Sequence, residues 1–280
     1  MWYAGAVRPV KKLRERMGCL TGLSFLWLEI TRRCNLTCEH CYLSSGPSLP
    51  LTEGMQFGDW CRVLDDARAA GCRRVQFIGG EPTVHPDLSR LLEHTARAGF
   101  RQCEVFTNAT LLREELVETI KRLGVLVHFS FYSHDSAVHD RITGQPGSFH
   151  RTVAGVKHLV ARRVRTAAGL IRVIDDSRHV KETRRFLRDL GIRSIAEDRV
   201  RGVGRGEHLV PGVQPRRELC GACWSGKLCV DASGDARPCV FARDVLVGNV
   251  RNAGLHRVVN GAALRAFRRA MFMGEQGGLE

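Results

Sequence analysis

The stretch that decides the fold is Thr-Arg-Arg-Cys-Asn-Leu-Thr-Cys-Glu-His-Cys-Tyr, residues 31–42. Its three cysteines, Cys34, Cys38 and Cys41, have a CxxxCxxC spacing and follow the apolar run Leu23 to Ile30 directly. Because that run predicts a buried strand, the cysteines lie on a short loop that leaves the strand end. Such a loop can wrap three thiolates around one metal centre, one thiolate short of a full set.

Three thiolates on one loop fit two kinds of metal site. A four-iron cluster is usually held by four thiolates, and with three protein ligands it keeps one iron open to something else. A structural zinc site is normally closed by four ligands, and His40 could supply the fourth. We favour the cluster and keep zinc as the alternative.

Together with Tyr42 directly behind them, the three cysteines resemble the signature of the radical S-adenosylmethionine (SAM) enzymes, and the resemblance extends over most of the chain. In that family the methionine amino and carboxylate groups of SAM chelate the open iron. The resemblance implies one SAM-binding 4Fe–4S cluster, reductive cleavage of SAM to a 5'-deoxyadenosyl radical, and abstraction of a substrate hydrogen. It also implies an electron donor such as flavodoxin or ferredoxin.

A repeated βα unit follows the cysteine loop. Gly71, Gly99, Gly124 and Gly191 each end a helix-like segment, and glycine just past a helix end takes the left-handed conformation at little cost. The pattern predicts helices at 53–70, 87–98, 112–123, 148–163 and 179–190, and further strands at 75–78, 103–106, 125–131, 168–174 and 192–196. The pattern alone fits an open sheet or a barrel, and the family resemblance implies a partial (β/α)6 barrel, open on one side.

Composition divides the chain into four parts. These are an N-terminal extension at 1–22, the barrel at 23–198, a linker at 199–215, and a small cysteine-rich part with a terminal helix at 216–280. The turn-rich run Arg201-Gly-Val-Gly-Arg-Gly206 is interpreted as linker. A glycine-rich phosphate cradle is the alternative, and it is disfavoured because no strand-to-helix context frames the run.

The C-terminal part carries a second cysteine set: Cys220, Cys223, Cys229 and Cys239. Four thiolates in a segment too small for its own core could hold zinc in a ribbon-like knuckle. Their surroundings, with Gly248-Asn249-Val250 beyond, resemble the SPASM or twitch extension of radical SAM enzymes. This resemblance implies an auxiliary 4Fe–4S cluster, and no cysteine after Cys239 remains to hold a second one.

Several residues near predicted strand ends are candidates for binding SAM. Gly79-Gly80-Glu81-Pro82 resembles the family's GGEP element, which contacts the methionine amino group. By the same resemblance, Asn108 and Ser130 bind the ribose hydroxyls and a carboxylate, and Tyr42 brings its backbone near the adenine. Arg172 could pair with the SAM carboxylate. Capping of the following turns is an equally good interpretation of Asn108 and of Ser130.

Composition limits the classes of partner. The 280 residues include 43 Lys and Arg against 29 Asp and Glu, a net charge of +14 that invites a nucleic-acid interpretation. We expect no nucleic acid, because the basic residues are spread along nearly every predicted helix and aromatic residues make up only 7%. No segment is long and apolar enough to span a membrane, and no secretory signal is present, so we expect a cytoplasmic protein.

Residues 130–149 resemble the corresponding region of enzymes that modify ribosomally made peptides. The predicted substrate is therefore a precursor peptide, which would be crosslinked or oxidised. Since 22 residues cannot make an independent leader-binding domain, the enzyme binds the peptide directly or a separate leader-binding protein presents it. The alternatives are a twitch-type dehydrogenase of a small amino sugar or alcohol, and a zinc-holding basic binding module without enzymatic activity.

Overall fold

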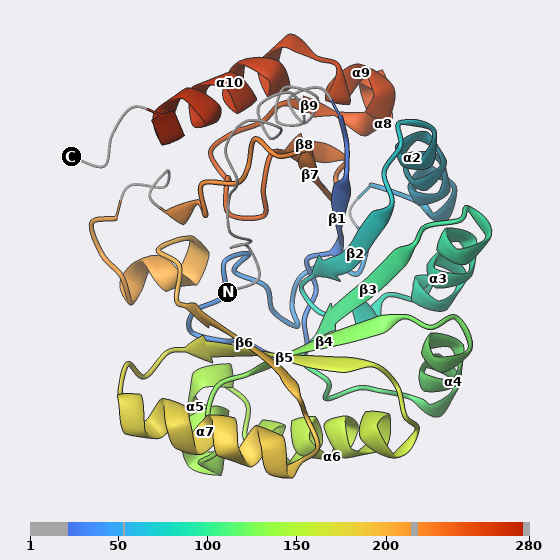
Figure 1. Cartoon of the computed structure of the whole chain (residues 1–280). Helices are drawn as coiled ribbons and strands as arrows, with labels where there is room; N and C mark the ends of the chain where they lie inside the picture. Colours follow the sequence, from blue (N-terminus) through green and yellow to red (C-terminus); the bar gives the residue numbers. More distant parts are fainter. Residues whose placement is uncertain (1–21, 53, 214–217, 277–280) are drawn as a thin grey trace.

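One curved sheet organises the molecule (Figure 1). The computed structural model describes residues 22–52, 54–213 and 218–276, and these contain nine strands in the order β6-β5-β4-β3-β2-β1-β7-β8-β9. The six strands expected for the barrel are all parallel: β1 (Phe25–Thr31), β2 (Arg74–Gly79), β3 (Gln102–Thr107), β4 (Leu126–Phe131), β5 (Thr166–Arg172) and β6 (Ser194–Arg199). The predicted partial barrel is confirmed.

Helices cover the outer face of this sheet (Figure 1). They are α2 (Phe57–Ala69), α3 (Leu88–Arg97), α4 (Glu114–Arg122), α6 (Ser148–Ala161) and α7 (Ser177–Asp189). Each predicted helix is present within a few residues of its expected bounds. The first begins at Phe57 instead of residue 53, because the Asp59 carboxylate accepts a hydrogen bond from the Gln56 amide (2.8 Å) and fixes the first turn there.

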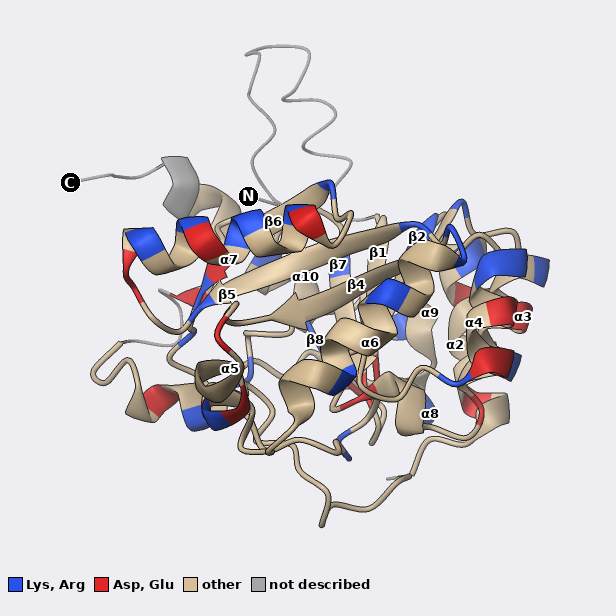
Figure 2. Cartoon of the chain, turned by 90° about the horizontal axis from the view of Figure 1, so that it is seen from below, with Lys and Arg blue, Asp and Glu red and all other residues tan. Residues whose placement is uncertain are grey.

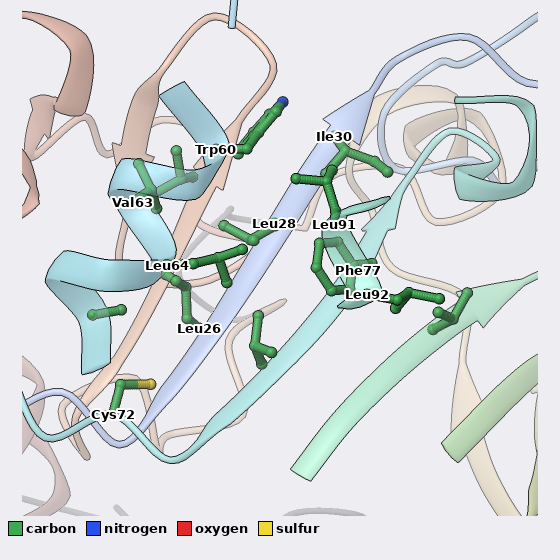
Figure 3. Close-up of a cluster of buried hydrophobic side chains, with 14 of the residues drawn as sticks. Leu26, Leu28, Ile30, Trp60, Val63, Leu64, Cys72, Phe77, Leu91 and Leu92 are labelled. Atoms are coloured by element: carbon green, nitrogen blue, oxygen red, sulfur yellow. The ribbon is translucent and has the colours of Figure 1, made fainter. Parts of the chain in front are cut away.

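The main core lies between β1 to β3 and their helices. In Figure 3, side chains of α2, among them Trp60 and Leu64, point towards Leu26 and Leu28 of β1. All seven residues of β1 are buried, because α2 covers one face and the barrel interior the other. Cys72 is also fully buried in this core.

The C-terminal part continues the same sheet. Strand β7 (Lys227–Asp231) pairs in parallel with β1, and β8 (Asp235–Arg237) and β9 (Gly248–Asn249) follow antiparallel. Short helices α8 (Val250–Ala253) and α9 (Leu255–Val259) precede α10 (Ala262–Gln276), whose fully buried Arg268 donates to the Lys227 carbonyl (3.2 Å). Strands β7 and β8 form a hairpin. The cysteine-rich part thus forms one wall of the barrel.

Charges are dispersed over the surface. Figure 2 shows Lys and Arg on most helices and loops, interspersed with Asp and Glu. This distribution fits the expected solvated basic surface. None of the helices in the described ranges could serve as a membrane span.

A helix that the sequence did not predict, α5 (Ser136–Thr143), follows β4. Asp135 caps its start by accepting from the Ala137 amide (2.8 Å), and Gly144 ends it in the left-handed conformation with φ 65°. The helix is only eight residues long and lacks a clear apolar period, which explains why the pattern did not reveal it.

His139 of α5 is buried beside the aromatic rings of Phe131 and Phe149. Burial lowers the pKa of this imidazole from 6.5 to about 4. The unfolded chain therefore binds a proton between pH 6.5 and 4 that the folded chain does not, and stability falls as the pH falls through this window.

We predict that His139 alone removes up to about 3 kcal/mol of unfolding free energy between pH 6.5 and pH 4. Urea unfolding at several pH values measures this. His139→Gln should flatten the dependence, whereas His256→Gln, at an exposed histidine, should leave it unchanged. Equal pH slopes in the wild type and the His139 variant would contradict the prediction.

Candidate metal centres and cofactor cavity

The cysteine loop after β1 presents its sulfur atoms to hydrogen-bond donors. The Leu36 amide lies 3.4 Å from the Cys34 sulfur, and the Ser45 amide lies 3.4 Å from the Cys41 sulfur. The side-chain amide of Asn108 approaches the Cys34 sulfur at 3.8 Å. Donors of this kind stabilise thiolates and tune iron–sulfur clusters.

Burial disfavours charge on these sulfurs. It raises the pKa of the Cys38 thiol to about 12 and that of the Cys34 thiol further. Thiolates in such buried surroundings are stable only when a bound cationic centre compensates their charge. The three cysteines therefore fit a metal centre by their chemistry.

Among the described residues, no three His, Cys, Asp or Glu side chains converge closely enough to hold a single metal ion as they stand. In a four-iron cluster each thiolate binds a different iron, so the sulfur atoms need not meet at one point. The His40 ring packs edge-on against Tyr132 at 4.7 Å and lines the barrel cavity. Its place in the cavity offers no support for its expected alternative role as a zinc ligand.

The GGEP element lies against the cysteine loop. The Gly80 amide donates to the Thr31 carbonyl (2.7 Å), and the Glu81 amide donates to the Arg33 carbonyl (2.9 Å). A Cβ on Gly80 would lie 2.2 Å from the Arg33 oxygen. The glycine is therefore needed for close approach of the protein's own loop, whereas the sequence suggested close approach of a ligand.

Glu81 is completely buried, and its carboxylate is fully engaged. It accepts from the Thr83 amide (3.0 Å) and hydroxyl (2.7 Å), the Thr107 hydroxyl (2.6 Å) and the Asn108 amide (2.7 Å). Burial raises the pKa of this carboxyl group, and these donors oppose the rise. Glu81 thus ties the ends of β2 and β3 together beside the cysteine loop.

Helix α5 supports the loop from the other side. The Thr37 amide donates to the Thr143 carbonyl and the Glu39 amide to the Ile142 carbonyl, both at 3.0 Å. A Cβ on Gly144 would lie 2.3 Å from the Thr37 hydroxyl. Part of the 130–149 stretch, which the sequence associated with peptide-modifying enzymes, is therefore a support for the cysteine loop.

A cavity of about 810 Å³ occupies the barrel interior. Of the residues predicted to bind SAM, Tyr42 and Ser130 line this cavity. Asn108 lies beside it and uses its side-chain amide to hold Asn35 (2.9 Å) of the cysteine loop. Arg172 is exposed at the end of β5, with Asp175 at 3.6 Å, and does not line the cavity.

Sequence reasoning missed most of the polar cavity lining. His40 faces the cavity, and burial lowers its pKa to about 4, so the imidazole is neutral. A layer of polar side chains crosses β2 to β4 within the barrel: Gln76, Gln102, Glu104 and His128. The Glu104 carboxylate accepts from the Gln76 amide (2.6 Å) and lies 3.1 Å from the His128 ring. The available signal was the spacing of two between Gln102 and Glu104 on β3, which places both on one face of the strand.

The second cysteine set borders the same cavity. Cys223, Cys229 and Cys239 are buried in an apolar cluster with Trp27 of β1, while Cys220 is exposed and lines the cavity. Interaction with the sulfur atoms of Cys220 and Cys239 raises the pKa of the Cys223 thiol. The structure therefore brings the second set together beside the open side of the barrel.

A buried ionic contact joins the two cysteine regions. Glu29 of β1 is completely buried and accepts from the Tyr42 hydroxyl (3.1 Å) and from Arg243 (2.8 Å). Tyr42 follows the first cysteine set, and Arg243 follows the second. The contact could not be predicted from the sequence, because Arg243 is 214 residues from Glu29 in the chain.

Comparison with known families decides the assignment. The model of the radical SAM superfamily matches residues 28–187, more than half of the chain. This chain belongs to the radical SAM superfamily. A second model, an iron–sulfur cluster-binding domain named SPASM, matches residues 220–276. The cofactors of this radical SAM chain are accordingly SAM with a 4Fe–4S cluster in the barrel and an iron–sulfur cluster in the C-terminal part.

Individual relatives act on different substrates. The chain is 27% identical over 266 residues to the antilisterial bacteriocin subtilosin biosynthesis protein AlbA of Bacillus subtilis, covering 83% of this chain and 58% of AlbA. It is 34% identical over 132 residues to the AdoMet-dependent heme synthase of Methanosarcina barkeri, covering 47% of this chain and 37% of that protein. The chain thus spans little more than half of AlbA and much less of the heme synthase.

Solved structures share the fold. SuiB of Streptococcus suis, in its complex with the precursor peptide SuiA, superposes with a TM-score of 0.73 at 15% identity. The match covers 96% of this radical SAM chain and 75% of SuiB. The barrel with its C-terminal extension is therefore an architecture that this chain and SuiB have in common.

We predict that anaerobically reconstituted protein holds about eight irons, as two four-iron clusters. Replacing Cys34, Cys38 and Cys41 together by Ala should leave about half of the iron, because the second set keeps its own cluster. Metal analysis measures both values. Cys61→Ala is the matched control, since Cys61 lies on α2 outside both sets. Stoichiometric zinc with a single iron cluster would restore the zinc-ribbon interpretation of the second set.

Proposed function

We propose that this chain is a radical SAM enzyme that crosslinks or oxidises a ribosomally made precursor peptide. The observation that carries the proposal is the common cavity: His40 and Tyr42 of the first cysteine loop and Cys220 of the second set line one space of about 810 Å³ inside the barrel. A substrate in this space lies between the two candidate cluster sites.

In the proposed assignment, Cys34, Cys38 and Cys41 hold the SAM-binding cluster, and the second set holds one auxiliary 4Fe–4S cluster. When bound, the first cluster and SAM supply a 5'-deoxyadenosyl radical that removes hydrogen from an unactivated carbon. Tyr42, Ser130 and the neutral His40 would contact the cofactor from the cavity wall. The GGEP element, Asn108 and Arg172 remain proposed cofactor contacts, of which the first two also order the cysteine loop.

The layer of Gln76, Glu104 and His128 would receive the substrate. Polar and apolar side chains meet there, because the Phe106 ring stacks on the His128 ring at 5.8 Å and both line the cavity. Such a mixed lining can orient a side chain by a few hydrogen bonds while it excludes water. Removal of one hydrogen atom would leave a substrate radical. Formation of the product would then release one electron, which the auxiliary cluster could accept, and one proton, which the Glu104–His128 pair could accept.

The likeness to AlbA and to SuiB supports a peptide substrate. The net charge of +14 also suits an acidic leader segment. The proposal includes an electron donor such as flavodoxin or ferredoxin, and either direct peptide binding or presentation by a separate leader-binding protein. Residues 1–21, on which the expected N-terminal extension falls, lie outside the described residues.

The rival candidate is a radical SAM dehydrogenase of a small amino sugar or alcohol. Its supporting observation is the short second cysteine set, which has no ligands for a further cluster within this sequence. A small polar substrate would also fit the Gln76 to His128 layer. The two candidates differ in substrate and share the cofactor chemistry.

We expect the reduced wild type to release 5'-deoxyadenosine slowly in the absence of substrate, because the cleavage of SAM does not require a peptide as hydrogen donor. Cys38→Ala should abolish the release, since its thiolate is a proposed cluster ligand. Chromatography of the anaerobic reaction quantifies the nucleoside, with Cys61→Ala as the control of unchanged activity. A Cys38 variant as active as wild type would remove the basis of the proposed function.

A co-encoded peptide incubated with enzyme, SAM and reductant should lose hydrogens in pairs, as a new crosslink or an oxidised residue requires. Mass spectrometry of the peptide detects the change, and Cys38→Ala provides the inactive control. If the peptide mass stays constant while a sugar alcohol from a neighbouring pathway is oxidised, the dehydrogenase is the correct candidate.

A further inference from the structure

The glycine-rich run 201–206 is neither a free linker nor a phosphate cradle, because it lies against the cysteine loop. Within it, the half-buried Arg205 makes three contacts with that loop. Its guanidinium donates to the Cys38 carbonyl and to the Ser45 carbonyl, both at 2.8 Å, and its amide donates to the Cys41 carbonyl (3.0 Å). One arginine thus binds the carbonyl groups of two predicted cluster ligands and of the residue that ends the loop.

Gly204 makes this approach possible. It has a φ of 62°, and a Cβ there would lie 2.5 Å from the Tyr42 oxygen and 2.6 Å from the Cys41 oxygen. A side chain would therefore push the segment away from the loop and break the Arg205 contacts. The glycine content of the run is explained by contact with the protein's own backbone.

The same segment reaches the second cysteine region. Arg201 donates to the Glu218 carbonyl (2.8 Å) just before Cys220, and its guanidinium lies 5.0 Å from the centre of the Phe241 ring, two residues after Cys239. Arg199 pairs with the buried Glu218 carboxylate at 3.1 Å. Segment 199–206 therefore contacts both cysteine regions, and Arg199 and Arg201 line the cavity between them.

We propose that Arg205 is a positioning residue that clamps the cysteine loop and raises the reduction potential of the cluster bound there. Its two side-chain bonds fix the backbone on both sides of Cys41, and its positive charge favours the more negative, reduced form of the cluster. The inference rests on the proposed assignment of the cluster to Cys34, Cys38 and Cys41.

An anaerobic redox titration of the holoenzyme followed by electron paramagnetic resonance tests this. The signal that changes on addition of SAM reports the cluster of the first set. Arg205→Gln removes the charge and should shift the midpoint potential of this signal to a more negative value. Arg205→Lys keeps the charge but cannot hold both carbonyls at once, so its midpoint should lie close to that of the wild type.

Iron content and thermal melting of each variant accompany the titration. Arg178→Gln, at an exposed arginine of α7 that pairs with Glu182, is the matched control and should keep the wild-type midpoint. If Arg205→Gln loses the SAM-sensitive signal and about half of its iron while its melting temperature stays near that of the wild type, the clamp is confirmed by loss of the cluster.

An Arg205→Gln variant with full iron and the wild-type midpoint overturns the inference. If Arg205→Gln does not fold, the Arg205→Lys variant is compared with a charge-free Arg205→Met variant. A midpoint potential of Arg205→Lys near the wild-type value supports the proposal. A midpoint of Arg205→Lys that is shifted as far from the wild-type value as that of Arg205→Met overturns the proposal. A wild type without any SAM-sensitive iron signal would instead refute the proposed function itself.

Discussion

The parallel pairing of β1 with a strand on each side is the constraint on which the rest of the structure depends. On one side β2 brings the GGEP element to the carboxyl end of β1, where Gly80 and Glu81 bind the cysteine loop backbone. On the other side β7 brings the second cysteine set to the same strand, with Cys229 opposite Trp27. The first set follows the carboxyl end of β1, whereas Cys220 and Cys223 precede β7, and one cavity inside the barrel is lined by His40 and Tyr42 of the cysteine loop and by Cys220.

The buried Glu29 charge follows from this arrangement. β1 has the barrel interior on one face, so Glu29 can remain ionised only with partners that reach it there, which are Tyr42 and Arg243. Burial raises the pKa of Glu29, and Arg243 opposes the rise. Removing one partner of a buried ion pair typically costs about 3–5 kcal/mol, because the other charge remains buried. The contact therefore makes the position of one cysteine region depend on that of the other.

Much of the fold could be predicted from the sequence, because glycine stops and apolar runs are local signals. They gave six parallel strands and five helices in the correct order. Helix α5 was missed because its stability comes from Asp135 and from contacts with the cysteine loop. A pattern of apolar residues does not indicate contacts of these kinds. The pairing of β7 with β1 was also unpredictable, since nothing near Lys227 indicates a partner in the first strand.

Only those parts of the candidate site that have a local sequence signal could be predicted. Cysteine spacing is local and stood out at once, whereas the layer around Glu104 and His128 is assembled from separate strands. The role of Arg205 was hidden because a glycine-rich run resembles a linker until its partner is known. Arg172 was a candidate because it stands at a strand end, but arginine is abundant in this chain, so that position is a weak signal. Its side chain faces solvent near Asp175.

The sheet places the first strand of the barrel beside one of the last. Ser24 and Ser225, which share a hydrogen bond where these strands begin, are 201 residues apart in the chain. During synthesis, the βα units from β1 to β6 can assemble while one edge of the apolar β1 still lacks its neighbour. An unpaired apolar edge is a template for aggregation, so the nascent protein is most vulnerable until its C-terminal segment has emerged.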